Sequence, residues 1–217
     1  MKYKAIIFDL DGTLLNTIDD LADSVRYVQN KFGWPMDSTD VVKSHVGNGI
    51  RKLIIRSVPS GEKNRDFENA YRDFKAYYKE HCEDKTDLYP GIVELLQELK
   101  TANIKMAIVS NKANDAVEKL YKTYFTDYIE VALGEMEDKG IRKKPAPDLV
   151  NMALEKLGVK REDALYVGDS DVDKATADNS KMDCALCKWG FREEELLKSL
   201  EPKYLIEKPM DLARVIK

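Results

Sequence analysis

The sequence predicts an α/β protein in which a parallel sheet is covered by helices on both faces and carries an inserted all-helical subdomain. From residue 86 onward, short apolar runs alternate with helical patterns, which is typical of parallel strands joined by crossover helices. Residues 16–83 have helical periodicity and no strand signal. We therefore expect a core of residues 1–15 and 84–217 and a helical insertion of residues 16–83.

The first strand is expected at residues 5–8, where the run Ala-Ile-Ile-Phe is short, apolar and rich in β-branched and aromatic side chains. Asp9, Asp11 and Gly12 follow it directly. Alternate side chains of a strand share a face, so the two carboxylates can converge if the chain turns at the glycine. Two close carboxylates repel each other unless a cation or a shared proton intervenes. This pair therefore predicts a site for a hard divalent metal with oxygen ligands.

The insertion shows the three-to-four residue spacing of amphipathic helices. Ile18, Leu21, Val25 and Val28 recur at this spacing in its first segment. Helices are expected at residues 16–33, 41–46, 50–58 and 62–82.

The remaining core elements follow in regular alternation. Strands are expected at residues 105–109, 129–133, 164–167, 183–187 and 204–206. Helices are expected at residues 91–102, from about 112 to 124, at 148–157, after 173, at 193–200 and at 210–216. Gly158 directly follows the helix expected at residues 148–157 and is suited to cap its C-terminus.

Polar residues follow several of these strands. The residues in question are Asp9 and Asp11, Ser110 and Asn111, Lys144 on a loop, and Asp169 and Asp173. Each alone has a plain explanation, because an Asp or Ser after a strand is often a helix N-cap and a lysine before proline is usually solvated. Loops after parallel strands share one edge of a sheet, so the groups are expected to meet there.

In this order, these residues match all four motifs of the haloacid dehalogenase superfamily of phosphotransferases, which the chain resembles along its whole length. The resemblance implies a Rossmann-like core. The insertion is similar to the helical, C1-type cap of the phosphoglycolate phosphatase and β-phosphoglucomutase branch. Segments 46–49, 89–91 and 188–190 resemble the phosphoglycolate phosphatase-like group in particular.

The resemblance implies a role for each acid and for the lysine. Asp9 would be the nucleophile that forms an aspartyl-phosphate, and Asp11 would act as general acid and then as general base. Lys144 would pair with both the phosphoryl group and Asp9. Mg²⁺ would be held by Asp9, by the backbone carbonyl of Asp11 and by Asp169, with Asp173 holding the metal or its waters from further out.

Contacts to the substrate are expected from Thr13, Gly47, Asn48, Arg51, Ser110, Asn111 and Lys144. Ser110 and Asn111 would hydrogen-bond the phosphoryl group. Thr13 would position the first loop or simply serve a turn. The segment 47–51 is either a loop that meets a small carboxylate or a helix-initiating turn with a surface arginine.

Two positions depart from the family pattern. Asn179-Ser180-Lys181 stands where an Ala-Gly pair is usual, so Lys181 is expected to take a left-handed conformation that glycine would accept more easily. Asn16 stands where an acid is common. The first departure bears on stability more than on mechanism, and the second bears on the cap hinge and not on the nucleophile.

The sequence therefore predicts an enzyme, a Mg²⁺-dependent phosphatase that hydrolyses a small phosphate monoester similar to 2-phosphoglycolate. A β-phosphoglucomutase and a pyrophosphatase or nucleotide phosphatase of the same superfamily stay open, because the leaving group is set by cap shape. A non-catalytic phosphate-binding regulatory module is the alternative of another class, and the intact set of site residues argues against it.

Composition narrows the partners and the setting. The 217 residues carry a net charge of −4, which suggests neither nucleic acid nor an anionic membrane. No apolar run approaches the roughly 18 residues of a transmembrane helix. Three cysteines do not suit a disulfide framework. We expect a cytoplasmic monomer or homodimer whose partner is a small phosphorylated metabolite.

Overall fold

The computed structural model describes residues 2–216, which form two compact units. One unit contains the segment up to Leu15 and the chain from Leu88 onward, and the other is Asn16–Asp87. The expected boundary at residues 83/84 lies four residues earlier than the observed one. Residues 84–87 stay with the helices because the backbone amides of Lys85 and Thr86 donate to the carboxylate of Asp20.

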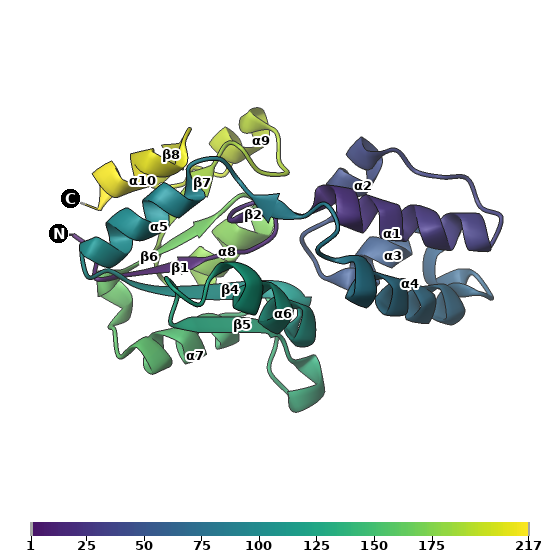
Figure 1. Cartoon of the computed structure of the whole chain (residues 1–217), viewed down its shortest axis with the longest axis horizontal. Helices are drawn as coiled ribbons and strands as arrows, with labels where there is room; N and C mark the ends of the chain where they lie inside the picture. The colour runs from purple at the N-terminus through teal and green to yellow at the C-terminus, as the bar shows by residue number, and fades with distance from the viewer. Residues whose placement is uncertain (1, 217) are drawn as a thin grey trace. The chain divides into compact units, whose positions relative to one another are not determined.

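The core is built on a six-stranded sheet whose strand order is β5-β4-β1-β6-β7-β8 (Figure 1). Every neighbouring pair is parallel. The strands are β1 Ala5–Phe8, β4 Lys105–Ala113, β5 Val131–Glu135, β6 Ala164–Gly168, β7 Asp183–Cys187 and β8 Tyr204–Ile206. The α/β class with a parallel sheet is thus confirmed.

Helices cover both faces of this sheet. Along β1, Ile6 and Phe8 pack on one face with α5, α6 and α10, whereas Ala5 and Ile7 pack on the other face with α7, α8 and α9. Figure 1 shows α5 and α10 together on one side of the strands and α7 on the other. These helices are α5 Ile92–Thr101, α6 Asn114–Tyr124, α7 Asp148–Leu157, α8 Asp171–Asn179, α9 Glu194–Ser199 and α10 Pro209–Val215. Because both faces of β1 are buried, its sequence is apolar throughout.

The sheet register brings the carboxyl ends of the three central strands together. Phe8 of β1 lies opposite Ile108 of β4 and Val167 of β6. The residue after β1, Asp9, donates its backbone amide to the carbonyl of Val167 at 2.8 Å. Residues that follow these strands therefore meet at one edge, where open parallel sheets bind ligands.

Three expected strands have different bounds in the structure, and β6 differs only by ending one residue later, at Gly168. Strand β4 continues to Ala113 instead of ending at residue 109, with an irregular register between Val109 and Ala113. Strand β5 begins at Val131, two residues later than expected. Gly158 and Lys181 adopt the expected left-handed conformations, with φ of 63° and 54°.

The second unit is helical, as expected. It contains α1 Ile18–Lys31, α2 Thr39–His45, α3 Ile50–Ser57 and α4 Phe67–His81. The single helix expected at residues 62–82 is wrong at its start: Gly61–Lys63 form a separate 3₁₀ turn and α4 begins at Phe67. Gly61 has a φ of 53°, and the Asn64 side chain accepts the backbone amide of Asp66, which interrupts a continuous helix.

The chain passes between the units through two-residue strands, β2 Leu15–Asn16 and β3 Asp87–Leu88, which form a two-stranded sheet. Next to them, the buried carboxylate of Asp20 accepts the backbone amides of Lys85 and Thr86 and the Thr86 hydroxyl, at 2.8–3.1 Å. These bonds tie the start of α1 to the segment that returns toward the core.

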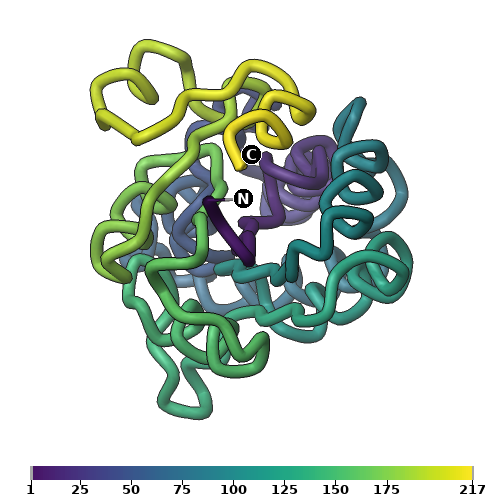
Figure 2. The backbone as a smooth tube through the Cα atoms, turned by 90° about the vertical axis from the view of Figure 1, so that its left-hand side faces the viewer, coloured from purple at the N-terminus to yellow at the C-terminus, as the bar shows by residue number. Residues whose placement is uncertain are grey.

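The described ends of the chain lie side by side (Figure 2). The amide of Lys2 donates to the carbonyl of Ile216 at 3.0 Å. Within residues 2–216, no helix combines the length and the apolar character that crossing a bilayer requires.

Candidate active site

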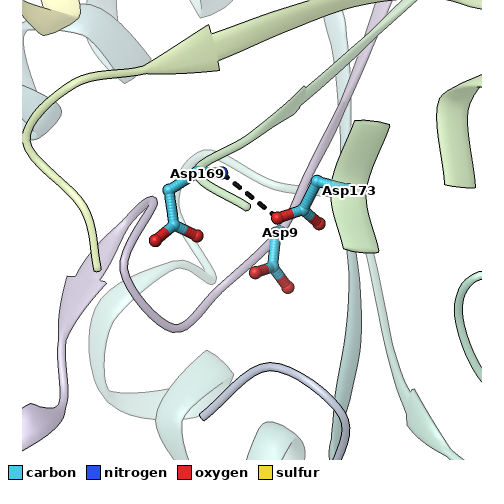
Figure 3. Close-up of side chains that lie close together, drawn as sticks. All are labelled: Asp9, Asp169 and Asp173. Carbon is cyan, nitrogen blue, oxygen red and sulfur yellow. Dashed lines mark hydrogen bonds between the residues drawn. The ribbon is translucent and has the colours of Figure 1, made fainter. Parts of the chain in front are cut away.

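Three buried carboxylates meet at the carboxyl edge of the sheet. Asp9 follows β1, Asp169 follows β6, and Asp173 lies in the first turn of α8. One oxygen of each lies within 4.8 Å of the others (Figure 3). Like charges this close are unfavourable in a buried setting, so the cluster requires compensating positive charge.

Lys144 supplies part of that charge from the loop between β5 and α7. Its Nζ donates to Asp9 Oδ1 at 2.6 Å, to Asp173 Oδ1 at 2.9 Å and to the Tyr166 hydroxyl at 3.2 Å. The Asn111 side-chain amide donates to the Lys144 carbonyl at 3.0 Å and so anchors this loop to β4. The lysine that the sequence placed on a loop is therefore a buried bridge between two acids.

The environment sets the charge states of this bridge. Burial by itself lowers the pKa of Lys144, but Asp173 and Asp9 raise it more, so the group stays an ammonium. Burial and the charge of Asp173 raise the pKa of Asp9 well above its ordinary value, against the lowering effect of Lys144. A cation placed beside Asp9 would reverse this shift and favour the ionised carboxylate.

Asp173 is fixed by the start of α8. Its Oδ2 accepts the Asp169 and Ser170 amides at 3.2 and 3.1 Å and the Ser170 hydroxyl at 2.6 Å. Ser170 in turn caps the helix, which forms a reciprocal capping box. Burial raises the pKa of Asp173, but Lys144 and Ser170 outweigh this effect and the pKa is lowered. Asp173 is thus held ionised opposite Lys144.

Unlike Asp9 and Asp173, Asp169 forms no hydrogen bond with Lys144 in the described part of the chain. Its Oδ2 accepts the backbone amide of Phe191 at 2.6 Å, and its Oδ1 accepts the Thr13 hydroxyl at 3.4 Å. Burial and the charge of Asp173 raise the pKa of Asp169 to about 7, despite the Phe191 amide. The charge of this carboxylate is therefore only partly compensated.

Gly12, Gly168 and Gly190 make room for the carboxylates of Asp169 and Asp173. A Cβ at Gly12 would lie 2.4 Å from Asp169 Oδ2, and a Cβ at Gly168 would lie 2.2 Å from the Asp173 carboxyl carbon. Gly12 also has a φ of 85°, which a side chain would disfavour. Three converging oxygen donors in this glycine-lined space fit a hard divalent cation, and the donor set contains no soft ligand.

The first loop carries a second acid with its own lysine. Asp11 Oδ1 accepts a hydrogen bond from Lys112 Nζ at 2.9 Å, so its carboxylate lies outside the three-carboxylate cluster. The Thr13 carbonyl accepts the Trp189 indole N–H at 3.0 Å. Buried Ser110 accepts the Lys112 amide at 3.1 Å. Thr13 therefore holds the loop in place from both its hydroxyl and its carbonyl.

The expected cap residues belong to the helical unit, where each has partners. Asn48 Oδ1 accepts from Arg56 Nη2 at 2.8 Å, and Arg56 Nη1 donates to the His45 carbonyl at 2.7 Å. Arg51 forms ion pairs with Glu62 and Glu68. The loop that contains Gly47, with a φ of 118°, is thus braced by an arginine that the sequence reading did not single out.

The structure brings together all the expected core residues near one edge and also reveals unexpected ones. Lys112, Tyr166 and the Phe191 amide contact expected site residues, yet none was among the candidates. Lys112 could have been identified from the sequence, because it lies two residues after Ser110 and three residues after the end of the expected strand at residue 109. Tyr166 lies inside an apolar strand, and a backbone amide has no residue-type signal.

The parallel α/β fold and this carboxylate–lysine edge fit a hydrolase, and the comparisons agree. The profile of the haloacid dehalogenase-like hydrolase family matches residues 6–187, and the chain belongs to this family. It is a phosphoglycolate phosphatase-like enzyme within it, as the relatives indicate.

The relatives match along nearly the whole chain. A phosphoglycolate phosphatase of Aquifex aeolicus is 31% identical, covering 98% of this chain and 96% of its own length. A protein of Caldanaerobacter subterraneus subsp. tengcongensis, provisionally named pyrophosphatase PpaX, is 33% identical and covers 100% and 96%. A crystal structure from Lactobacillus delbrueckii subsp. bulgaricus, provisionally described as a phosphoglycolate phosphatase, has a TM-score of 0.93 at 34% identity, covering 100% and 99%.

Proposed function

We propose that this protein is a Mg²⁺-dependent phosphatase that hydrolyses a small phosphate monoester such as 2-phosphoglycolate through an aspartyl-phosphate on Asp9. The observation that carries the proposal is the contact of Lys144 with both Asp9 and Asp173 inside a buried carboxylate cluster. A phosphate monoester dianion repels nucleophiles, so its hydrolysis depends on positioning and charge neutralisation. This edge supplies a nucleophile, a fixed cation and further oxygen donors.

Asp9 is the group best placed to attack phosphorus. The 2.6 Å bond from Lys144 to Oδ1 fixes the carboxylate and leaves its other oxygen to form the bond. Lys144 also places an ammonium where charge develops on the phosphoryl oxygens. Asp173, held by Ser170 and by two backbone amides, keeps Lys144 in position from the other side.

Asp11 is the group assigned to proton transfer. Its side chain is 15% exposed and does not belong to the buried cluster, so it is open to a reacting molecule. It would donate a proton to the leaving oxygen as the ester bond breaks, and then take one from the water that attacks the aspartyl-phosphate. Ser110 and Asn111 are assigned to the phosphoryl group, with Asn111 also anchoring the Lys144 loop.

Mg²⁺ would be held by Asp9, Asp169 and the backbone carbonyl of Asp11, with Asp173 holding the metal or its waters from further out. When bound, the ion supplies positive charge to the attacking carboxylate and to the phosphoryl oxygens. The support is the all-oxygen donor set, the space left by Gly12 and the raised pKa of the buried Asp169 carboxyl.

The choice of a small carboxylate-bearing substrate rests on the relatives named as phosphoglycolate phosphatases. Gly47, Asn48 and Arg51 remain the candidates for contacting it. Arg51 would have to leave Glu62 and Glu68, an exchange that costs little for half-exposed ion pairs. Pyrophosphate is the second candidate substrate, because a relative provisionally named a pyrophosphatase is 33% identical over the whole chain.

Phosphate release from phosphoglycolate, pyrophosphate, β-glucose 1-phosphate and nucleoside monophosphates tests the proposal, with Mg²⁺ and with EDTA. We expect release to require Mg²⁺ and to be fastest, as kcat/KM, with phosphoglycolate. Asp9→Asn should abolish turnover with an unchanged circular dichroism spectrum. Asp138→Asn, at an exposed position in the 3₁₀ turn Glu137–Lys139, is the matched control and should keep full activity. An active Asp9→Asn enzyme would exclude the mechanism.

Trapping the intermediate tests the nucleophile directly. An aspartyl-phosphate reduced by borohydride becomes homoserine, which mass spectrometry locates in the peptide containing position 9. We expect the modification at Asp9 only when substrate and Mg²⁺ are both present. Homoserine at another aspartate would move the nucleophile, and its absence throughout would favour direct attack by water.

A further inference from the structure

Lys112 is a buried lysine that the proposed chemistry does not use. It lies in the last part of β4, and its side chain is only 2% exposed. Lysine is rarely buried unless its charge is paired, because removing an ammonium from water is costly. Its Nζ donates to Asp11 Oδ1 at 2.9 Å, which meets this requirement. Asp11 therefore compensates the buried charge of Lys112.

The backbone around Lys112 is also fixed. Its amide donates to the Ser110 hydroxyl at 3.1 Å, and the register of β4 against β5 is irregular between Val109 and Ala113. Irregularities of this kind re-aim side chains and are common beside active sites. Here β4 continues beyond its apolar residues, and the Lys112 ammonium reaches Asp11 in the loop after β1.

The two buried lysines divide the acids between them. Lys144 contacts Asp9 and Asp173, whereas Lys112 contacts Asp11. In the Asp11 pair the acid is 15% exposed and the lysine 2%, so the lysine approaches from the protein side and leaves the acid open. An ammonium on Oδ1 fixes the orientation of the carboxyl group while Oδ2 remains for a proton.

We propose that Lys112 is a positioning residue that aims the Asp11 carboxyl at the leaving-group oxygen. This inference rests on the proposed function. In the step concerned, the Oδ2 proton of Asp11 moves to the ester oxygen as the phosphorus–oxygen bond breaks and the bond to Asp9 forms. The Asp11 carboxylate is then ready to take a proton from water. Without Lys112 the carboxyl rotates freely and proton donation loses its alignment.

The test compares leaving groups of different basicity. Alkyl phosphates need a proton on the departing oxygen, whereas p-nitrophenyl phosphate leaves readily without one. For Lys112→Met, which keeps the apolar stem but removes the charge, we expect kcat/KM to fall roughly 30- to 100-fold with alkyl phosphates. This is less than the roughly 10²- to 10⁴-fold contribution of a general acid, because only the alignment of Asp11 is lost. We expect less than a threefold fall with p-nitrophenyl phosphate, so activity should depend more steeply on leaving-group basicity.

Companion variants keep the test decisive. In an Asp11→Asn background, Lys112→Met should add no further dependence on the leaving group, because the proton donor is already gone. Lys112→Arg keeps a charge but moves its position, so it should show the same change to a smaller degree even if Lys112→Met does not fold. An equal loss for all leaving groups would overturn the inference and assign Lys112 to the phosphoryl group or to stability. A wild-type enzyme that releases phosphate from no substrate would instead refute the proposed function.

Discussion

Replacing Asp169 by Asn should make the metal-free protein more stable at alkaline pH while removing its response to Mg²⁺. Asp169 is buried, and burial together with the charge of Asp173 raises its pKa from 3.8 to about 7. Between these values the folded chain holds a proton that the unfolded chain lacks. Stability therefore falls as pH rises through this window, and the whole penalty is present above pH 7.

The magnitude follows from that shift. A difference of about three pKa units corresponds to roughly 4 kcal/mol of unfolding free energy. Asparagine keeps an acceptor for the Phe191 amide but loses the charge-assisted strength of that 2.6 Å bond, a loss of about 1 to 2 kcal/mol. We expect a net gain of about 2 kcal/mol at pH 8.5 in EDTA, which is roughly 4 to 8 °C in Tm for a chain of this size.

The assay is thermal unfolding of wild type and Asp169→Asn at pH 5 and 8.5, each in EDTA and in Mg²⁺. The advantage of the variant should appear at pH 8.5 and vanish at pH 5, where the wild-type carboxyl is protonated. Mg²⁺ should raise the Tm of wild type by mass action and leave the variant nearly unchanged. Asp138→Asn, an exposed substitution, should behave as wild type throughout. A variant that is less stable than wild type at both pH values would refute the reasoning.

Two further predictions concern buried polar contacts. Tyr166→Phe removes a hydroxyl that donates to Asp173 at 3.0 Å and accepts from Lys144 at 3.2 Å. We therefore expect the free energy of unfolding, measured in urea, to fall by about 2 kcal/mol and kcat/KM to fall roughly tenfold. If both values stayed unchanged, the hydroxyl would not be coupled to the pair of Lys144 and Asp173. Asp20→Asn places an amide donor opposite the backbone N–H groups of residues 85–86, which then lose an acceptor. Hydrogen exchange at these two backbone amides should be at least tenfold faster in the variant. Equal protection from exchange in wild type and variant would contradict this prediction.

The regular part of the fold was predictable because parallel strands are buried on both faces. The runs at 5–8, 183–187 and 204–206 are apolar or nearly so, and each is a strand with the expected bounds. The prediction for strand β4 ended too early because the sequence turns polar after Val109, whereas the strand continues to Ala113. A hydrophobic pattern does not detect the part of a strand that carries polar site residues. The helical stripe of α4 starts at Phe67, and the residues before it had no such pattern.

The meeting of Asp9, Asp169 and Asp173 was also predictable, since strand ends share an edge in a parallel sheet. Their partners were harder to predict. Tyr166 reads as a core residue in an apolar strand, and only its hydroxyl identifies it as part of the Lys144 bridge. The Phe191 amide reaches Asp169 through a loop conformation that no residue type encodes. Sequence patterns locate the candidate site residues, whereas the contacts that orient them depend on tertiary packing.

Counting the charges at the site gives the physical reason for including a divalent cation in the proposal. Four carboxylates, those of Asp9, Asp11, Asp169 and Asp173, have two lysines in contact with them. Lys112 neutralises Asp11, and one ammonium is shared by Asp9 and Asp173, so two negative charges remain when all four acids are ionised. A phosphate dianion entering this edge would increase the repulsion unless positive charge came with it. A divalent ion held here would balance the excess, lower the pKa of the proposed nucleophile Asp9 and offer the incoming phosphoryl oxygens a favourable partner.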